Sequence, residues 1–413
     1  MNGFGIVLVA SLLVARCGSQ IPTPATAPPT APATAPATPP ATAPATATAP
    51  PTASATAPAT APVPAPVPAP ATIEPTGAPV SGAADPTFEQ LIGQKLVVSM
   101  AGVTPSADLI GRIRRGEIGG VILFGFNITT PAALIALTGE LRGAAVAGGQ
   151  PPLLIAVDQE GGPVKRIIWA PPTLSAPQMG SIGSASVARA QGASTGVALH
   201  GLGINVDFAP VADVPGSTAS FMYQDGRTFS FSAPRTAVLA DAFASGLESK
   251  GVLPTMKHFP GIGFATLNTD SNVVTIGAST AALAAGLRPY QTAIGHDIPM
   301  IMLSNATYTA YDPFNAASWS RAIAVTLLRQ DLGFTGVTIT DSLDGTALAR
   351  GLSTRLLAIR AARAGTDMIL LTGSEASTRA VYAALLSNAK DGAIPRAILR
   401  ASYDRIIALK AGL

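Results

Sequence analysis

The chain has 413 residues, of which 37 are Pro and 41 are Gly, and only 12% are charged. A formal net charge of +3 over this length, with no Lys/Arg cluster interleaved with aromatic residues, argues against a nucleic-acid partner. Three His and one Cys cannot supply a metal site of the usual His/Cys type, and one Cys cannot form a disulfide within the chain. We therefore expect no metal and no other cofactor.

The N-terminus has the pattern of an export signal. Residues Phe4 to Ala15 form an apolar run as long as a signal-peptide core and shorter than a membrane span. Cys17 follows, where a lipoprotein signal places the cysteine that receives the lipid. Arg16 and the lack of a preceding Lys or Arg depart from that pattern. Residues 1–20 are therefore predicted to be a signal peptide or a lipoprotein-type anchor, and the protein is predicted to be exported, to the cell surface or the medium.

The next segment, from Ile21 to about Pro79, consists almost entirely of Pro, Ala and Thr. Such a composition cannot bury a core and favours extended, partly polyproline II conformations. We predict a disordered linker over residues 21–84, which separates the anchor from a domain spanning residues 85–413.

After Asp85, short apolar runs alternate with helical patterns. Runs that are apolar on both faces are typical of parallel strands buried on both sides. Eight such runs with intervening helices predict a single (β/α)8 barrel of the TIM type. A doubly wound open sheet is the alternative, but no Gly-rich phosphate turn follows the first run. The predicted strands are 96–100, 120–124, 153–158, 204–211, 253–259, 300–305, 337–341 and 368–372, and the predicted helices are 131–147, 186–201, 234–250, 280–294, 320–332 and 347–364.

Polar residues end several of the predicted strands. In a (β/α)8 barrel these ends share one rim, which is where functional groups lie. Carboxylates, one lysine and one histidine therefore converge, without a phosphate cradle. This composition suits glycosidic chemistry, in which one group attacks or stabilises an oxocarbenium-like centre and another moves a proton. The rim residues are Asp158, Glu160, Asp207, Asp213, Lys257, His258, Ser304, Asn305 and Asp341.

Some of these residues also fit a structural role. Asp207 and Asp213 could equally hold loops by accepting backbone N–H bonds. Lys257 and His258 precede Phe-Pro-Gly at a strand end, which favours a functional role over a plain polar pair. The remaining His and Trp side chains are expected to be structural, solvated or simply packed: His200, His296, Trp169 and Trp319.

Six longer motifs follow one another along the barrel region: AVDQEGGPVKR (156–166), GINVDFAPVADV (203–214), GRTFS (226–230), KHFPGIG (257–263), MIMLSNATYTAYDP (300–313) and GFTGVTITDSLDG (333–345). Together they resemble glycoside hydrolase family 3, and within it the bacterial β-N-acetylglucosaminidases that act on cell-wall sugars. The resemblance runs from about Phe88 to the last helix.

The resemblance implies a retaining glycosidase that removes terminal β-linked N-acetylhexosamine. Asp341, in ITDSL, matches the family nucleophile, which forms a covalent glycosyl-enzyme that water then hydrolyses. A β-glucosidase is the alternative specificity, although Ser-Leu after Asp341 fits the hexosaminidase pattern, whereas β-glucosidases usually have Trp there. The positions that match sugar-holding residues are Asp158, Arg166, Arg227, Lys257 and His258.

One departure from the family pattern concerns the acid/base residue. In the hexosaminidase subgroup a loop after KHFPG carries Asp-Ser-His, and that His is the acid/base. Here the loop reads Asn268-Thr269-Asp270-Ser271-Asn272, so Asn272 replaces the His. Three outcomes stay open: Asp270 acts as acid/base with a raised pKa, the enzyme is slow, or the barrel binds sugar without turnover. Further departures are Pro163, Ile262 and Asn305.

The expected partner is therefore a carbohydrate that contains N-acetylhexosamine. We expect the protein to be a monomer, and to touch a membrane only through its N-terminal anchor.

Overall fold

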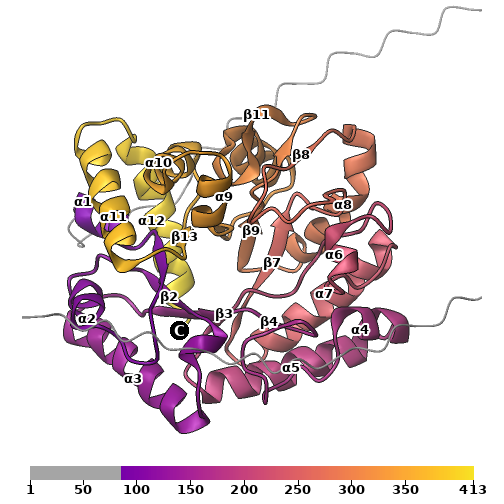
Figure 1. The fold of residues 1–413 in the computed structure, drawn as a ribbon, viewed down its shortest axis with the longest axis horizontal. Helices are drawn as coiled ribbons and strands as arrows, with labels where there is room; N and C mark the ends of the chain where they lie inside the picture. The colour runs from indigo at the N-terminus through magenta and orange to yellow at the C-terminus, as the bar shows by residue number, and fades with distance from the viewer. Residues whose placement is uncertain (1–84) are drawn as a thin grey trace, which may run out of the picture. The chain divides into compact units, whose positions relative to one another are not determined.

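The computed structural model describes residues 85–413, so the predicted anchor with Cys17 and the predicted linker lie outside the described residues. Eight parallel strands lie side by side in the order β12-β9-β7-β6-β3-β2-β1-β13, surrounded by helices (Figure 1). A bridge between Ile339 and Met368 joins the two edge strands and closes the sheet. The predicted (β/α)8 barrel is confirmed. Its strands are β1 (Leu96–Ser99), β2 (Gly120–Leu123), β3 (Leu154–Val157), β6 (Val206–Asp207), β7 (Leu253–Phe259), β9 (Met300–Leu303), β12 (Val337–Thr340) and β13 (Ile369–Leu371).

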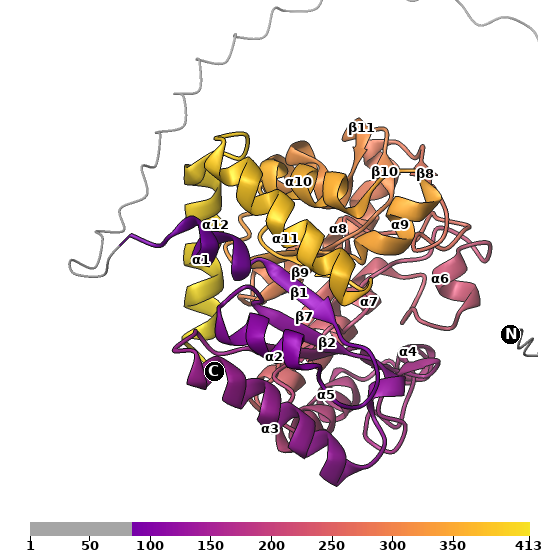
Figure 2. The same cartoon turned by 60° about the vertical axis from the view of Figure 1, so that its left-hand side comes forward.

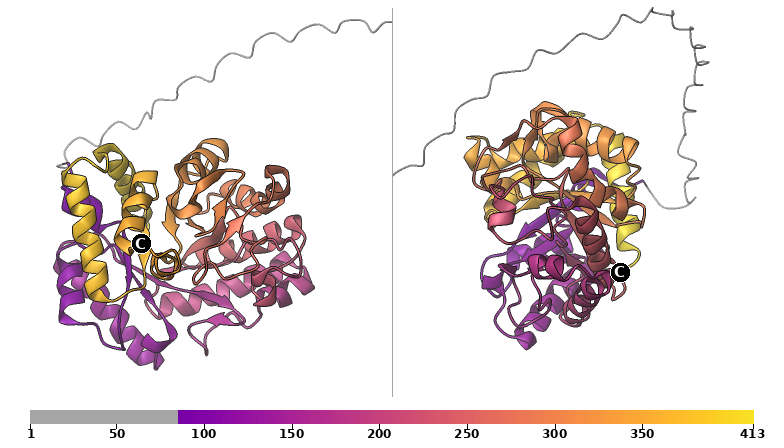
Figure 3. Two further views of the ribbon diagram at one scale, coloured as in Figure 1. Left: turned by 45° about the horizontal axis from the view of Figure 1, so that its top comes forward. Right: turned by 90° about the vertical axis from the view of Figure 1, so that its right-hand side faces the viewer.

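Helices connect successive strands and flank the barrel in every view (Figure 3). Two predicted helices, 131–147 and 280–294, have the predicted bounds. Thr130 caps the first of these by accepting from the N–H of Ala133, and Pro131 occupies its first turn. The main helices are α1 (Phe88–Gly93), α2 (Ala107–Arg114), α3 (Pro131–Ala147), α5 (Ala185–Gly201), α7 (Ala233–Glu248), α8 (Thr280–Ile294), η3 (Ala322–Asp331), α10 (Thr354–Ala364), α11 (Glu375–Lys390) and α12 (Arg396–Lys410).

Two predicted elements differ from the structure by more than a shift of a few residues at their ends. The helix predicted over 347–364 is two helices, α9 (Leu343–Ala349) and α10, because the chain turns at Gly351 with φ +62°. The strand predicted over 204–211 is reduced to Val206–Asp207. The continuation of that strand leaves the ladder, except for a bridge from Val211 to Lys257.

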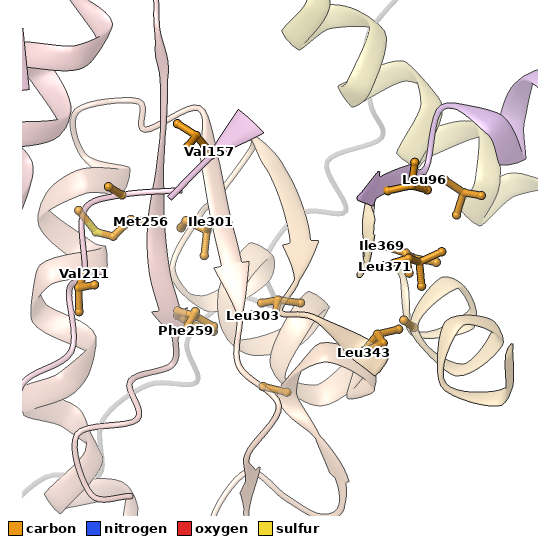
Figure 4. Close-up of a cluster of buried hydrophobic side chains, with 14 of the residues drawn as sticks. Leu96, Val157, Val211, Met256, Phe259, Ile301, Leu303, Leu343, Ile369 and Leu371 are labelled. Carbon is orange, nitrogen blue, oxygen red and sulfur yellow. The ribbon is translucent and has the colours of Figure 1, made fainter. Parts of the chain in front are cut away.

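The core has two layers because successive strand residues face opposite sides of the sheet. Val97, Ile122 and Leu154 belong to the cluster inside the barrel. Their strand neighbours pack outward against the helices, in the cluster that Figure 4 shows in part. Ile406 of α12, the yellow helix in Figure 2, joins the inner cluster. Lys410 of the same helix donates to the carbonyl of Gly119, just before β2, so α12 covers the end where the strands begin.

A buried carboxylate lies at the junction between β12 and β13. Asp367, fully buried, accepts from Arg329 Nη2 at 2.5 Å and from Arg405 Nη2 at 2.7 Å. Its Oδ2 also accepts from the N–H of Thr338 in β12 at 2.9 Å. Removing one member of such a buried, hydrogen-bonded set typically costs about 3–5 kcal/mol, because the remaining charges lose their partner. This cluster therefore fixes the last pairing of the barrel.

Short elements frame the opposite end of the barrel, where the strands finish. No helix within residues 85–413 combines the length and the apolar character needed to cross a membrane. The framing elements are η1 (Gly125–Asn127), the β4–β5 hairpin (Gln159–Gly161 and Val164–Lys165), α4 (Ala176–Ile182), α6 (Phe221–Gln224), η2 (Ala317–Trp319), α9 and the sheet of β8 (Thr275–Ile276), β10 (Thr307–Tyr308) and β11 (Asp312–Ala316).

Candidate active site

A cavity of about 440 Å³ opens at the carboxyl ends of the strands. Met302 and Leu370 form part of its floor and also belong to the inner core, so the cavity lies directly on the packed barrel interior. The predicted site residues come from strand β7 and from the connections that follow β3, β6, β7 and β12, and they meet here. They are Asp158, Arg166, Arg227, Lys257, His258, Asp270 and Asp341.

A cluster of ion pairs forms one wall of the cavity. Lys257 Nζ, within β7, lies 2.8 Å from Asp158 Oδ1 and 2.7 Å from Glu160 Oε1. Arg227 binds Glu160 with two parallel bonds of 2.9 and 2.7 Å. Arg166 Nη2 lies 3.3 Å from Asp158 Oδ2. Bidentate Arg–carboxylate geometry adds rigidity as well as energy, so these side chains are held in place before any ligand arrives.

The charges of this cluster control the protonation of its members. Burial opposes ionisation of Glu160, but Lys257 and Arg227 outweigh it and lower the pKa of Glu160 to about 2. The pKa of Asp158 is also lowered, since Lys257 and Arg166 overcome the same burial cost. Burial likewise opposes the charge on Lys257, yet the two carboxylates raise its pKa. The wall therefore presents fixed charges, which can bind the hydroxyl groups of a polar ligand.

Glu160 is the member of this cluster that we did not assign a role from the sequence. Its side chain is 4% exposed and contacts both Lys257 and Arg227. The signal was present in the DQEGG segment, where Glu160 lies two positions after Asp158. Nothing in the sequence shows that two cations from distant parts of the chain would meet there.

The carboxylate of Asp213 holds the imidazole of His258 in place. Asp213 Oδ2 lies 2.8 Å from His258 Nδ1, and Asp213 Oδ1 accepts from the N–H of Ile262 at 2.8 Å. Asp213 is fully buried. It therefore holds the loop after β7 and also orients the imidazole.

Asp207 has the structural role. It does not line the cavity and is fully buried beneath it, where its Oδ1 accepts from the N–H of Gln159 at 2.9 Å. Its Oδ2 has no hydrogen-bond partner among residues 85–413. Burial raises the pKa of Asp207 to about 8. The group is therefore a neutral acid over most of the physiological range.

Asp341 and Asp270 both line the cavity. Asp341 directly follows β12, and its Oδ1 accepts from the N–H of Ser342 at 2.8 Å. Asp270 lies on the loop between β7 and β8. The negative charge of Asp341 raises the pKa of Asp270 to about 7, and removal from water adds to the shift. The Asp270 side chain keeps contact with solvent, so the charge of Asp341 contributes more to this shift than burial does.

The loop that carries Asp270 is docked on α9. Thr346 Oγ1 donates to the carbonyl of Thr269 at 3.1 Å, and Thr269 is almost fully buried. A Cβ placed on Gly345 would lie only 2.1 Å from the carbonyl oxygen of Asp270. Glycine at this position therefore permits the close approach that keeps Asp270 beside Asp341.

Asn272, where the family resemblance implies a histidine, does not line the cavity. Its amide nitrogen donates to the carbonyl of Asn268 at 3.0 Å and to Ser271 Oγ at 3.1 Å. Asn272 therefore closes a turn within its own loop.

The other polar and aromatic candidates lie away from the cavity or serve packing. His296 pairs with Asp241 at 3.0 Å near the surface. Trp319 is buried against Arg350, while Trp169 is partly exposed. Within residues 85–413, no three or more His, Cys, Asp or Glu side chains are grouped so that they could hold a metal ion.

Comparison with known proteins identifies the family. The sequence model of the glycosyl hydrolase family 3 N-terminal domain matches residues 87–409 of this chain. The chain belongs to glycosyl hydrolase family 3. Membership of family 3 places it among the glycosyl hydrolases and agrees with the resemblance seen in the motifs.

Individual relatives cover most of the barrel. A protein of Arthroderma benhamiae described as a secreted glycosyl hydrolase is 32% identical over 328 residues, which are 78% of this chain and 92% of that protein. A β-N-acetylhexosaminidase structure from Beutenbergia cavernae has a TM-score of 0.73 and 32% identity, covering 80% of this chain and all of that chain. A family 3 β-N-acetylglucosaminidase from Paenibacillus has a TM-score of 0.75 and 29% identity, over 79% of this chain and 63% of that one.

Replacing Asp207 by Asn tests whether this acid is neutral in the folded protein. The folded state keeps a proton that the unfolded chain releases above about pH 4, so wild-type stability should fall as pH rises towards 8. Asn retains the Oδ1 acceptor and cannot ionise. The free energy of unfolding of Asp207→Asn, relative to wild type, should therefore increase between pH 5 and pH 8 in urea titrations. An equal difference at both pH values would contradict the assignment.

Proposed function

We propose that the protein is a retaining glycosidase that removes terminal β-linked N-acetylhexosamine. Asp341 is the nucleophile and Asp270 the acid/base. The observation that carries the proposal is that the two carboxyl groups line one cavity and the charge of Asp341 raises the pKa of Asp270 to about 7. One group can then be ionised while the other still holds a proton, as this chemistry requires.

The reaction proceeds in two steps. In the first, an oxygen of Asp341 attacks the anomeric carbon, the bond to the leaving group breaks, and the leaving oxygen takes the proton of Asp270. In the second, Asp270 accepts a proton from water, whose oxygen replaces Asp341 at the same carbon. The Ser342 N–H bond holds the attacking carboxylate in one orientation.

The sugar is held by the charged wall. Asp158 can accept hydrogen bonds from sugar hydroxyls, and Lys257, Arg166 and Arg227 can donate them. His258, fixed by Asp213, lies on the same side. The specificity for N-acetylhexosamine rests on the names of the Beutenbergia and Paenibacillus structures, and the alternative is a β-glucosidase specificity.

A sugar-binding protein without turnover is the competing function, because Asn272 cannot transfer a proton at useful pH. Its amide is engaged in the loop, and Asp270 in the same loop lies in the cavity. The effect of the Asp341 charge, which raises the pKa of Asp270, therefore favours the enzyme.

Variants of the two carboxylates test the roles. Asp341→Ala should reduce hydrolysis of aryl β-N-acetylglucosaminides to background. Asp270→Asn should lower the rate about 10²–10⁴-fold for poor leaving groups and little for the best ones, because only poor leaving groups need the proton. Wild-type kcat/KM should fall as pH rises through about 7, where Asp270 loses its proton. In Asp270→Asn, this decrease of kcat/KM with pH should be absent.

Two controls complete the test. NMR should show that the released sugar is at first the β-anomer, as retention of configuration requires. Binding of the free sugar with no turnover of any aryl β-glycoside would reject the enzyme and leave the sugar-binding function.

Gly345→Ala separates the position of Asp270 from its chemistry. The added methyl group forces the Asp270 backbone away, so the variant should lose rate on poor leaving groups and retain it on activated ones. Gly143→Ala in α3 is the matched control, since a Cβ there meets nothing within 4 Å. Unchanged leaving-group dependence in Gly345→Ala would show that Asp270 does not depend on this contact.

We also propose that the protein is exported and anchored through Cys17. The apolar run from Phe4 to Ala15 supports export, as does the description of the Arthroderma relative as secreted, and the position of Cys17 just after that run supports the anchor. In a bacterial host, the full chain should fractionate with membranes and incorporate labelled palmitate, and Cys17→Ser should abolish the labelling. Recovery of the wild-type chain from the cytosol would reject export.

A further inference from the structure

A second hollow lies beside the catalytic cavity, over the ends of β1 and β13. Its volume is about 570 Å³, and its walls come from residues 99–102, Phe126 and residues 372–376. Thr372 lines both hollows. Its Oγ1 lies 2.6 Å from Ser342 Oγ, one residue from the proposed nucleophile. The second hollow therefore begins next to the reacting centre.

A stacked pair of aromatic rings, Phe124 and Phe126, lies between the two hollows. Phe124 lines the catalytic cavity, and its ring stacks on that of Phe126 with centroids 5.7 Å apart and planes 12° from parallel. The guanidinium of Arg166, a member of the ion-pair cluster, lies over the Phe124 ring at 5.4 Å from its centroid and holds this ring in place. The Phe126 side chain is 63% exposed, so a large apolar face is open to solvent within this hollow.

The remaining wall is polar. It includes Ser99, Ser374 and Glu375, and the Glu375 carboxylate is oriented by Ser106 Oγ at 2.8 Å. An aromatic face opposite hydroxyl and carboxylate groups suits a ligand with one apolar face and an edge of hydroxyls. A pyranose ring has this character.

We propose that this hollow is the leaving-group subsite and binds the second sugar of the substrate on Phe126. The inference rests on the proposed function. If the catalytic cavity binds the terminal sugar, the rest of the substrate chain is the leaving group and must lie in an adjacent hollow. The position of Thr372 beside Ser342 makes this hollow continuous with the bond that breaks.

The test compares substrates that share the first sugar. N,N′-diacetylchitobiose places a second ring in the subsite, whereas β-N-acetylglucosaminyl fluoride carries no second ring. Phe126→Ala should lower kcat/KM for the disaccharide on the order of tenfold, mainly through KM, which is the size of one stacking contact. It should leave the fluoride unchanged, and Phe126→Trp should retain disaccharide activity.

Phe231→Ala is the matched control, because Phe231 is 47% exposed, packs on Tyr223 and lines a different hollow. It should behave as wild type on both substrates. Wild-type disaccharide kinetics in Phe126→Ala, an equal loss on both substrates, or a disaccharide-specific loss in Phe231→Ala alone would overturn the subsite.

Failure of the glycosidase proposal can be distinguished from failure of the subsite proposal. If the wild-type protein hydrolyses neither substrate, the glycosidase is rejected. Calorimetric titration with N-acetylglucosamine and with chitobiose then decides the subsite, since Phe126→Ala should weaken binding of the disaccharide alone. Equal affinity of wild type and Phe126→Ala for chitobiose would reject it.

Discussion

Closure of the barrel depends on a carboxylate that is wholly removed from water. Asp367 binds two arginines and the backbone of β12, and so ties together the first and last strands of the sheet order. Asp341 follows β12, and Thr372 follows β13. The distance between these two residues at the rim is therefore set by a pairing at the other end of the strands. A parallel sheet transmits this constraint well, because all of its strands finish at the same rim.

At the rim, charge is arranged in two different ways. Asp158 and Glu160 are each matched by a buried cation, so they stay ionised despite burial. Asp270 lies near the like charge of Asp341 and holds its proton to a higher pH. The same type of side chain thus stays ionised on one wall and keeps its proton to near neutral pH on the other. The difference comes from partners in distant parts of the chain, which local sequence alone could not reveal.

The sequence predicted the barrel well because eight runs apolar on both faces leave few alternatives to a buried parallel sheet. It predicted the cavity residues because strand ends in such a barrel meet, and because the family motifs matched. It failed where a single backbone position decides the outcome: Gly351 divides a helical pattern that periodicity alone treats as continuous. It also missed the contacts of Glu160 with Lys257 and Arg227, since pairing between distant residues leaves no local pattern.

The loop that carries Asp270 has Asn272 where the family resemblance implies a histidine, and its contacts are best considered together with α9. A histidine on a free loop can reach its substrate by moving, but a carboxyl group acts as an acid near neutral pH only if a like charge or burial raises its pKa. Gly345 allows the Asp270 backbone to pack against α9, and Thr346 fixes the preceding carbonyl. Because α9 begins two residues after Asp341, one short segment carries the charge that raises the pKa and the contacts that hold Asp270 near it. An exchange of histidine for aspartate as the acid would thus require a docked loop, and this chain has one.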